Sequence, residues 1–244
     1  MPDRRDLVLT LASLLVTRPV FALDDESLVW VCGDVPPFIS RGANGPQGYA
    51  FELYQRVSRQ AALPGELRFF PWARAMQMLL ARQAHGGLVV ARSPEREGMF
   101  RWLFPVGSFR FAVFTRPEDG PVPPDMASLH GRRVGWLRAS AGRDLLAATG
   151  VKHIIEGKDY QDLLALLQRG VVDAVVGPAP VLRALSSDAL RSTQLDRGLR
   201  LFAVAGPAMP EDVQRRLMAA YQQLVDGGVV GQLKKAYPDA FTDV

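Results

Sequence analysis

The chain has 244 residues, of which 48% are hydrophobic and 22% are charged, and its formal net charge is +4 at pH 7. These values are typical of a globular protein that buries a substantial core, and such a charge balance implies neither nucleic acid nor a membrane surface as a partner. The single cysteine, Cys32, excludes an internal disulfide and every multi-cysteine metal motif.

The N-terminal residues have the pattern of a secretory signal peptide. The pair Arg4-Arg5 precedes the apolar run 7–16, and residues 20–22 end it with a small-residue cleavage pattern. Because the run is too short for a membrane helix, we predict that residues 1–22 are a signal peptide. The arginine pair is a partial twin-arginine signal, which makes that export route one option. Export without disulfides favours a bacterial periplasm as the location.

Strand and helix patterns alternate along the rest of the chain, which indicates an α/β architecture with mostly parallel sheets. The Gly- and Pro-rich segment 33–47 reads as a loop. Helix 48–61 carries Tyr49, Leu53 and Val57 at four-residue spacing, which is typical of an amphipathic helix. The other elements expected in this half are a helix at 73–83 and strands at 28–32, 67–70, 88–90 and 109–115.

A proline-rich segment at 116–124 reads as a linker, and a second α/β series follows it. Two halves of similar size and pattern indicate two lobes. The elements expected after the linker are strands at 134–137, 152–155, 174–176 and 199–205, and helices at 140–148, 160–171, 181–190, 211–225 and 228–237.

The end of the strand at 88–90 carries the first chemical signal. Ala91 follows the strand, and Ser93 before Pro94 is a helix-start signal. A strand that runs into a helix N-terminus directs several backbone N–H groups to one place, which favours an anion. Arg96 adds a guanidinium able to bind a carboxylate through two hydrogen bonds. The alternative is that Arg96 is a solvated charge paired with a neighbouring glutamate.

Residues 91–96 followed by Phe104-Pro105 resemble a motif of periplasmic solute-binding proteins of the polar-amino-acid type. In that family a strand ends in Thr-x-Thr-Pro-Glu-Arg, followed by an aromatic residue and Ser-x-Pro. Segment 164–177 is similar to the family's second-lobe signature, and 211–237 to its closing helices. The resemblance implies that Arg96 binds a ligand carboxylate, with Ala91 in place of the hydroxyl residue that normally assists and Ser93 beside it.

The resemblance also implies the fold, a two-lobed type 2 periplasmic-binding-protein fold of the α/β class. Each lobe would be a mixed, mostly parallel sheet flanked by helices, with the ligand in the cleft between them. The implied first lobe is discontinuous, residues 25–113 plus 206–244, because the C-terminal helices complete it. The implied second lobe is residues 114–205.

Candidate ligand contacts in the first lobe follow two strands. The family places a segment similar to Pro36-Pro37-Phe38 against the ligand, so Phe38 is a candidate aromatic wall and Asp34 a partner for a positively charged ligand group. The alternative is that this segment only rigidifies a turn. Trp72 and Arg74 lie at a strand-to-helix junction, where open α/β sheets bind ligands. Trp72 would stack on the ligand and Arg74 would add a second cation, the alternative being a helix-capping role.

In the second lobe, residues 138–142 follow a strand and open the helix expected at 140–148. Ser140 is a candidate N-cap whose neighbouring amides would meet the same anion, and Arg138 would reach the cleft. Gly177 departs from the family, whose amino-acid binders carry an aspartate there for the ligand's ammonium group. An unpaired buried ammonium costs several kcal/mol. The glycine therefore favours an anionic ligand that lacks an amine.

Enzyme signatures are scarce. The three histidines, at 85, 130 and 153, have no metal-ligand spacing, and neither a Gly-x-Ser-x-Gly elbow nor a phosphate loop occurs. We predict a monomeric, non-enzymatic binding protein without cofactor or metal, which closes over a small molecule by hinge motion. By resemblance, its partner would be an ABC importer. Two alternatives remain open: a cyclic-acid dehydratase-like periplasmic enzyme with Asp34 or Glu95 as the acid, and a ligand-sensing domain for a membrane receptor.

Overall fold

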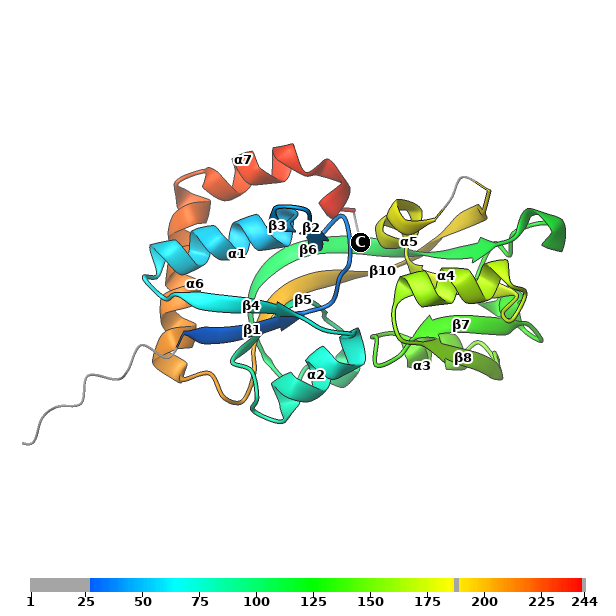
Figure 1. The fold of residues 1–244 in the computed structure, drawn as a ribbon, viewed down its shortest axis with the longest axis horizontal. Helices are drawn as coiled ribbons and strands as arrows, with labels where there is room; N and C mark the ends of the chain where they lie inside the picture. Colours follow the sequence, from blue (N-terminus) through cyan, green and yellow to red (C-terminus); the bar gives the residue numbers. More distant parts are fainter. Residues whose placement is uncertain (1–26, 187–188, 243–244) are drawn as a thin grey trace, which may run out of the picture.

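The computed structural model describes residues 27–186 and 189–242, and the predicted signal peptide lies outside the described residues. One mixed sheet has the strand order β4-β1-β5-β10-β6-β9-β7-β8 (Figure 1). β1 pairs in parallel with β4 and β5, and β7 with β8 and β9, whereas β6 and β10 pair antiparallel. The strands are β1 (Leu28–Cys32), β4 (Gly65–Phe69), β5 (Gly86–Ala91), β6 (Arg101–Thr115), β7 (Arg133–Leu137), β8 (His153–Gly157), β9 (Ala174–Pro178) and β10 (Arg191–Ala205).

The helices divide the molecule into the two lobes that the sequence predicts (Figure 1). The first lobe holds β1, β4 and β5 with α1 (Tyr49–Gln60), α2 (Trp72–Leu80), α6 (Glu211–Asp226) and α7 (Val229–Ala236). The second lobe holds β7, β8 and β9 with α3 (Arg143–Ala147), α4 (Tyr160–Gln168) and α5 (Ala179–Leu185). The C-terminal helices return to the first lobe, where Gln60 Nε2 donates to Gln223 Oε1 at 2.7 Å.

The predicted amphipathic pattern of the first helix is confirmed. Tyr49, Leu53 and Val57 are fully buried along one side of α1. The helix covers the sheet of the first lobe, and its buried residues belong to one apolar core that continues through both lobes. A short hairpin of β2 (Ser40–Gly42) and β3 (Gly45–Gln47) lies inside the segment that the sequence analysis reads as a loop.

The passage between the lobes differs from the prediction. The chain crosses within β6 and β10, of 15 residues each, whose pairing runs from Arg101 opposite Ala205 to Thr115 opposite Arg191. The predicted linker at 116–124 instead lies at the far end of the second lobe, where the Arg116 guanidinium donates to the carbonyl of Leu167 at 2.6 Å. The prediction was wrong because the strand at 109–115 is only the second half of β6. The lobe boundaries at 113/114 and 205/206 stay predictions.

Candidate functional site

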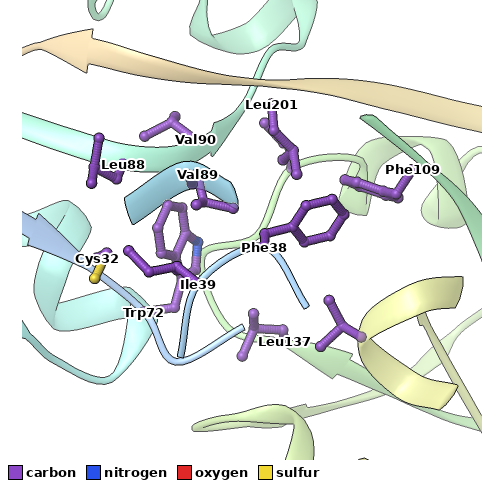
Figure 2. Close-up of a cluster of buried hydrophobic side chains, with 14 of the residues drawn as sticks. Cys32, Phe38, Ile39, Trp72, Leu88, Val89, Val90, Phe109, Leu137 and Leu201 are labelled. Atoms are coloured by element: carbon purple, nitrogen blue, oxygen red, sulfur yellow. The ribbon is translucent and has the colours of Figure 1, made fainter. Parts of the chain in front are cut away.

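A cavity of about 50 Å³, here called the inner chamber, lies where the two lobes meet. Part of its wall comes from the carboxyl ends of β5, β7 and β9, which is where open α/β sheets place ligands. Figure 2 shows Phe38 and Phe109 turned toward one another beside Leu201, with Leu137 of the second lobe nearby. The lining residues are Val35, Phe38, Trp72, Val89, Ala91, Arg96, Phe109, Phe111, Trp136, Leu137, Ser140, Ala141, Tyr160, Val176, Gly177, Pro178, Val181 and Leu201.

Arg96 is the only charged side chain among the described residues that line the chamber. The residue is 5% exposed, and its guanidinium donates from Nη1 to the Ala91 carbonyl at 3.2 Å and from Nη2 to the Ala139 carbonyl at 2.6 Å. Burial lowers the pKa of Arg96, while the nearby Glu95 and Tyr160 oppose that shift. No carboxylate of the described residues forms an ion pair with it. The buried cation therefore depends on carbonyl dipoles for its neutralisation.

Trp72, at the first position of α2, reaches across the cleft. Its indole Nε1 donates to the Ala139 carbonyl at 3.0 Å, so this carbonyl of the second lobe accepts hydrogen bonds from two side chains of the first. The Arg96 guanidinium carbon lies 5.9 Å from the centroid of the Trp72 ring, within the range of a cation–π contact. The aromatic wall predicted at position 72 is therefore part of the contact between the lobes as well as of the chamber.

Two residues at the chamber have backbone conformations that favour glycine. Val89, within β5, has φ 60°, and Ala139 has φ 58°. A positive φ is a genuine outlier for a β-branched residue, and such strained positions concentrate at functional sites. Val89 lines the chamber, and the Ala139 carbonyl accepts a hydrogen bond from the Arg96 guanidinium.

The loop before α3 differs from the prediction. Ser140 does not cap a helix; its hydroxyl donates to the Leu137 carbonyl at 2.7 Å, and α3 begins three residues later with Gly142 as its N-cap. The reason is local conformation, because Ala139 and Gly142 (φ 86°) both take left-handed angles that interrupt a helical turn.

The Gly142 amide has a partner in the first lobe, where the Glu95 carboxylate accepts its hydrogen bond at 3.2 Å. Partial burial acts to raise the pKa of Glu95. Hydrogen bonds from the backbone, among them the one from the Gly142 amide, together with the Arg96 charge, outweigh burial and lower it. The Gly142 amide, which was predicted to bind the ligand's anion, thus already donates its hydrogen bond to a carboxylate of the chain itself.

The remaining predicted residues fall into two groups. Ala91 and Gly177 line the chamber, and Ser93 is buried before η1 (Pro94–Arg96), a single 3₁₀ turn that begins where the helix-start signal indicates. Arg74 is exposed and donates to Gln77 Oε1 at 3.1 Å. Arg138 is exposed too, with Nε 3.4 Å from Glu156 Oε2. Neither of these two arginines lines the chamber.

Asp34 is exposed and lies in a second cavity of about 350 Å³, here called the outer pocket, together with Arg41, Lys158 and Asp159. The outer pocket shares four residues with the inner chamber: Val35, Trp72, Leu137 and Tyr160. The two charged groups therefore line different cavities, Arg96 the inner chamber and Asp34 the outer pocket.

Trp136 and Tyr160 are among the chamber residues that sequence reasoning missed. Tyr160 opens α4, and a Cβ atom added to Gly177 would lie 2.8 Å from Cε1 of its ring. Burial raises the pKa of the Tyr160 hydroxyl, and the Arg96 charge opposes this. Trp136 lies near the end of β7, 1% exposed, and its indole N–H has no hydrogen-bond partner among the described residues. The signal available in the sequence was a large aromatic residue at each of these strand and helix ends.

Within the described part of the chain, no group of three or more His, Cys, Asp or Glu residues is arranged to hold a metal ion. None of the helices described has the length and apolarity needed to span a bilayer.

No protein-family model and no curated protein sequence matches this chain. Its fold matches many solved structures. A histidine kinase sensor domain with similarity to periplasmic binding proteins has 22% sequence identity and a TM-score of 0.77, covering 87% of this chain and 96% of that domain. The arginine-, lysine- and histidine-binding protein ArtJ from Geobacillus stearothermophilus has 17% identity and a TM-score of 0.76, over 86% and 95%. The glutamate-bound GluR0 core from Nostoc punctiforme has 18% identity and a TM-score of 0.72, over 87% and 99%. The chain thus has the type 2 periplasmic-binding-protein fold.

Proposed function

We propose that this chain is a periplasmic solute-binding protein that captures a small carboxylate-bearing solute between its lobes and delivers it to an ABC importer. It acts as a monomer and without catalysis. Arg96 carries the proposal, because a 95% buried guanidinium without a carboxylate counter-ion lines a chamber shared by both lobes. A ligand carboxylate would supply that counter-ion in a bidentate pair, the strongest hydrogen-bonded arrangement available to arginine.

The solved structures with this fold support solute binding, since they include an arginine-, lysine- and histidine-binding protein and a glutamate-bound ligand-binding core. One of them is a histidine kinase sensor domain, which favours a second candidate function, ligand sensing for a membrane receptor. Both functions use the same chamber, and they differ in the partner protein that binds the closed, ligand-loaded form. A pull-down with the ligand-loaded chain separates them by whether an importer subunit or a receptor is recovered.

The two acids considered for an enzyme are poorly placed. Asp34 lines the outer pocket and is not among the residues that line the inner chamber. Glu95 is exposed and accepts the Gly142 amide, and its lowered pKa keeps it ionised at neutral pH. A general acid needs the opposite, a proton held near the operating pH and within reach of the substrate.

A thermal-shift screen of the purified full chain tests the proposal, with amino acids, polyamines, and mono- and dicarboxylic acids as ligands. We expect one carboxylate to raise the melting temperature saturably, because a ligand that binds only the folded state stabilises it by mass action. Arg96→Met should weaken that binding by about 100-fold, as expected for losing a charged, bidentate pair. Arg74→Met, which removes an exposed arginine outside the chamber, is the matched control and should bind as the wild type does. Undiminished binding by the Arg96 variant would contradict the proposal.

A further inference from the structure

We propose that the inner chamber selects a monocarboxylate with a small apolar body and no amino group, and that Trp136 and Tyr160 set this selectivity. The inference rests on the proposed function, since it takes Arg96 as the carboxylate site. It adds a ligand class and two specificity-determining residues.

The composition of the walls argues against an amino acid. Apart from Arg96, the described lining residues are uncharged, and most are aliphatic or aromatic. An α-ammonium group in the chamber would have no carboxylate partner there, because Asp34 lies in the outer pocket and Glu95 is held by Gly142. An unpaired buried cation beside a second cation is strongly unfavourable.

Tyr160 explains why no acid stands at the end of β9. A Cβ atom at position 177 would come within 2.8 Å of the Tyr160 ring and within 3.2 Å of Leu182 Cδ1. Side-chain atoms do not approach this closely without displacing a neighbour. Gly177 and Tyr160 therefore form a complementary pair, in which the aromatic ring fills the space that an aspartate would need. The same ring adds apolar wall to the chamber.

Trp136 supplies a second donor. Its indole N–H is buried without a hydrogen-bond partner among the described residues, and its ring lies against Phe111, with centroids 5.7 Å apart. A buried donor left unsatisfied costs about 1–3 kcal/mol, so such groups in native structures call for an explanation. The Ser140 hydroxyl already donates to Leu137. Because Trp136 also lines the chamber, its N–H is assigned, together with the Arg96 guanidinium, to the acceptor atoms of a carboxylate.

The size of the chamber limits the apolar body of the ligand. An engineered protein cavity of about 150 Å³ holds a benzene molecule. The inner chamber, at about 50 Å³, suits a body of a few carbon atoms rather than an aromatic ring. The test acid is isovalerate, a short branched monocarboxylate, and valine is the same skeleton with an added amino group.

Isothermal titration of the full chain with isovalerate, valine, succinate and aspartate tests the ligand class. We expect isovalerate to bind at least about tenfold more tightly than valine, and succinate and aspartate to bind more weakly than isovalerate. If valine binds as tightly as isovalerate and Arg96→Met abolishes both, the inference fails and the proposed function stands. If no carboxylate in this titration or in the wider thermal-shift screen binds, the proposed function fails with it.

Two variants test the residues. Trp136→Phe replaces the indole by a smaller aromatic ring without the N–H, so isovalerate affinity should fall about tenfold, the value of a hydrogen bond to a charged acceptor. Trp102→Phe is the matched control, because Trp102 packs on Phe100 and Phe202 outside the chamber. The double variant Gly177→Asp/Tyr160→Ala should gain valine binding relative to isovalerate. Equal isovalerate affinities of the two tryptophan variants, or no gain for valine in the double variant, would overturn the assigned roles.

Discussion

The two lobes contribute to the chamber in different chemical ways. The first lobe reaches across the cleft with side chains, since Arg96 and Trp72 donate to the Ala139 carbonyl and Glu95 accepts from the Gly142 amide. The second lobe meets all three with backbone groups. Its side chains at the chamber are mostly apolar or aromatic.

This difference indicates where substitutions act on each lobe. On the first lobe, exchanging one side chain removes a specific donor or acceptor. On the second lobe, the polar contacts depend on the left-handed conformations of Ala139 and Gly142, so side-chain exchanges there change the shape and apolarity of the chamber instead. The one charged side chain among the described lining residues, Arg96, thus comes from the first lobe, and the second lobe contributes mostly apolar and aromatic side chains.

The largest expected effect on stability comes from Gly177→Ala, which overpacks the contact between Gly177 and Tyr160 in the second lobe. The added methyl would lie 2.8 Å from the Tyr160 ring, and overpacking of a core typically costs about 1–3 kcal/mol of unfolding free energy. Urea denaturation measures this as a lower midpoint at an unchanged slope. The matched control is Gly231→Ala in α7, where an added Cβ meets nothing within 4 Å. That change should stabilise the protein by about 0.5–1 kcal/mol. If Gly177→Ala were neutral, Tyr160 would not exclude a side chain from position 177.

Trp72→Phe tests whether a side chain of the first lobe holds the two lobes together. The variant keeps an aromatic wall but removes the donor at 3.0 Å from the Ala139 carbonyl, which weakens the closed arrangement by about 1 kcal/mol. Small-angle scattering of the ligand-free protein should show a larger radius of gyration than the wild type, because more molecules open. Trp102→Phe removes the same atoms away from the cleft and should leave the radius unchanged. The same radius in all three proteins would show that this hydrogen bond does not hold the lobes together.

Much of the fold could be predicted from the sequence, because local patterns determine it. The four-residue spacing in α1 indicates that one face of the helix is buried, and the short apolar runs of β1 and β5 indicate buried strands. The length of β6 could not be read this way, since Pro105 and Gly107 are residues that disfavour strands. The structure accommodates them at a register shift, where Pro105 pairs with Phe202 and Gly107 with Leu201.

In the candidate site, too, residues marked by a local pattern could be predicted, whereas those whose role depends on tertiary contacts could not. Arg96 and Trp72 were predicted because they sit at a strand-to-helix junction or in a family motif. Tyr160 was missed, because its role depends on steric contact with Gly177, and no local pattern reports a contact between residues distant in the sequence. Ser140 was misassigned as a helix cap, because nothing about an alanine at position 139 signals a positive φ.

The smallest expected effect concerns the one contact in which the first lobe supplies the acceptor. Because the folded-state pKa of Glu95 is lowered, its stabilising contribution is present above the ordinary carboxyl pKa and is lost as pH falls through the lowered value. Glu95→Gln should therefore lower the unfolding free energy at pH 7 by only about 0.5 kcal/mol, since the side chain is exposed. The difference from the wild type should shrink as the solution is acidified below about pH 4.5. Other carboxyls of lowered pKa, such as Asp173, titrate in both proteins and cancel in this comparison. Urea denaturation of the two proteins from pH 7 to pH 3 measures the difference, and a gap that stayed constant or widened toward low pH would show that the ionised carboxylate does not support the contact between the lobes.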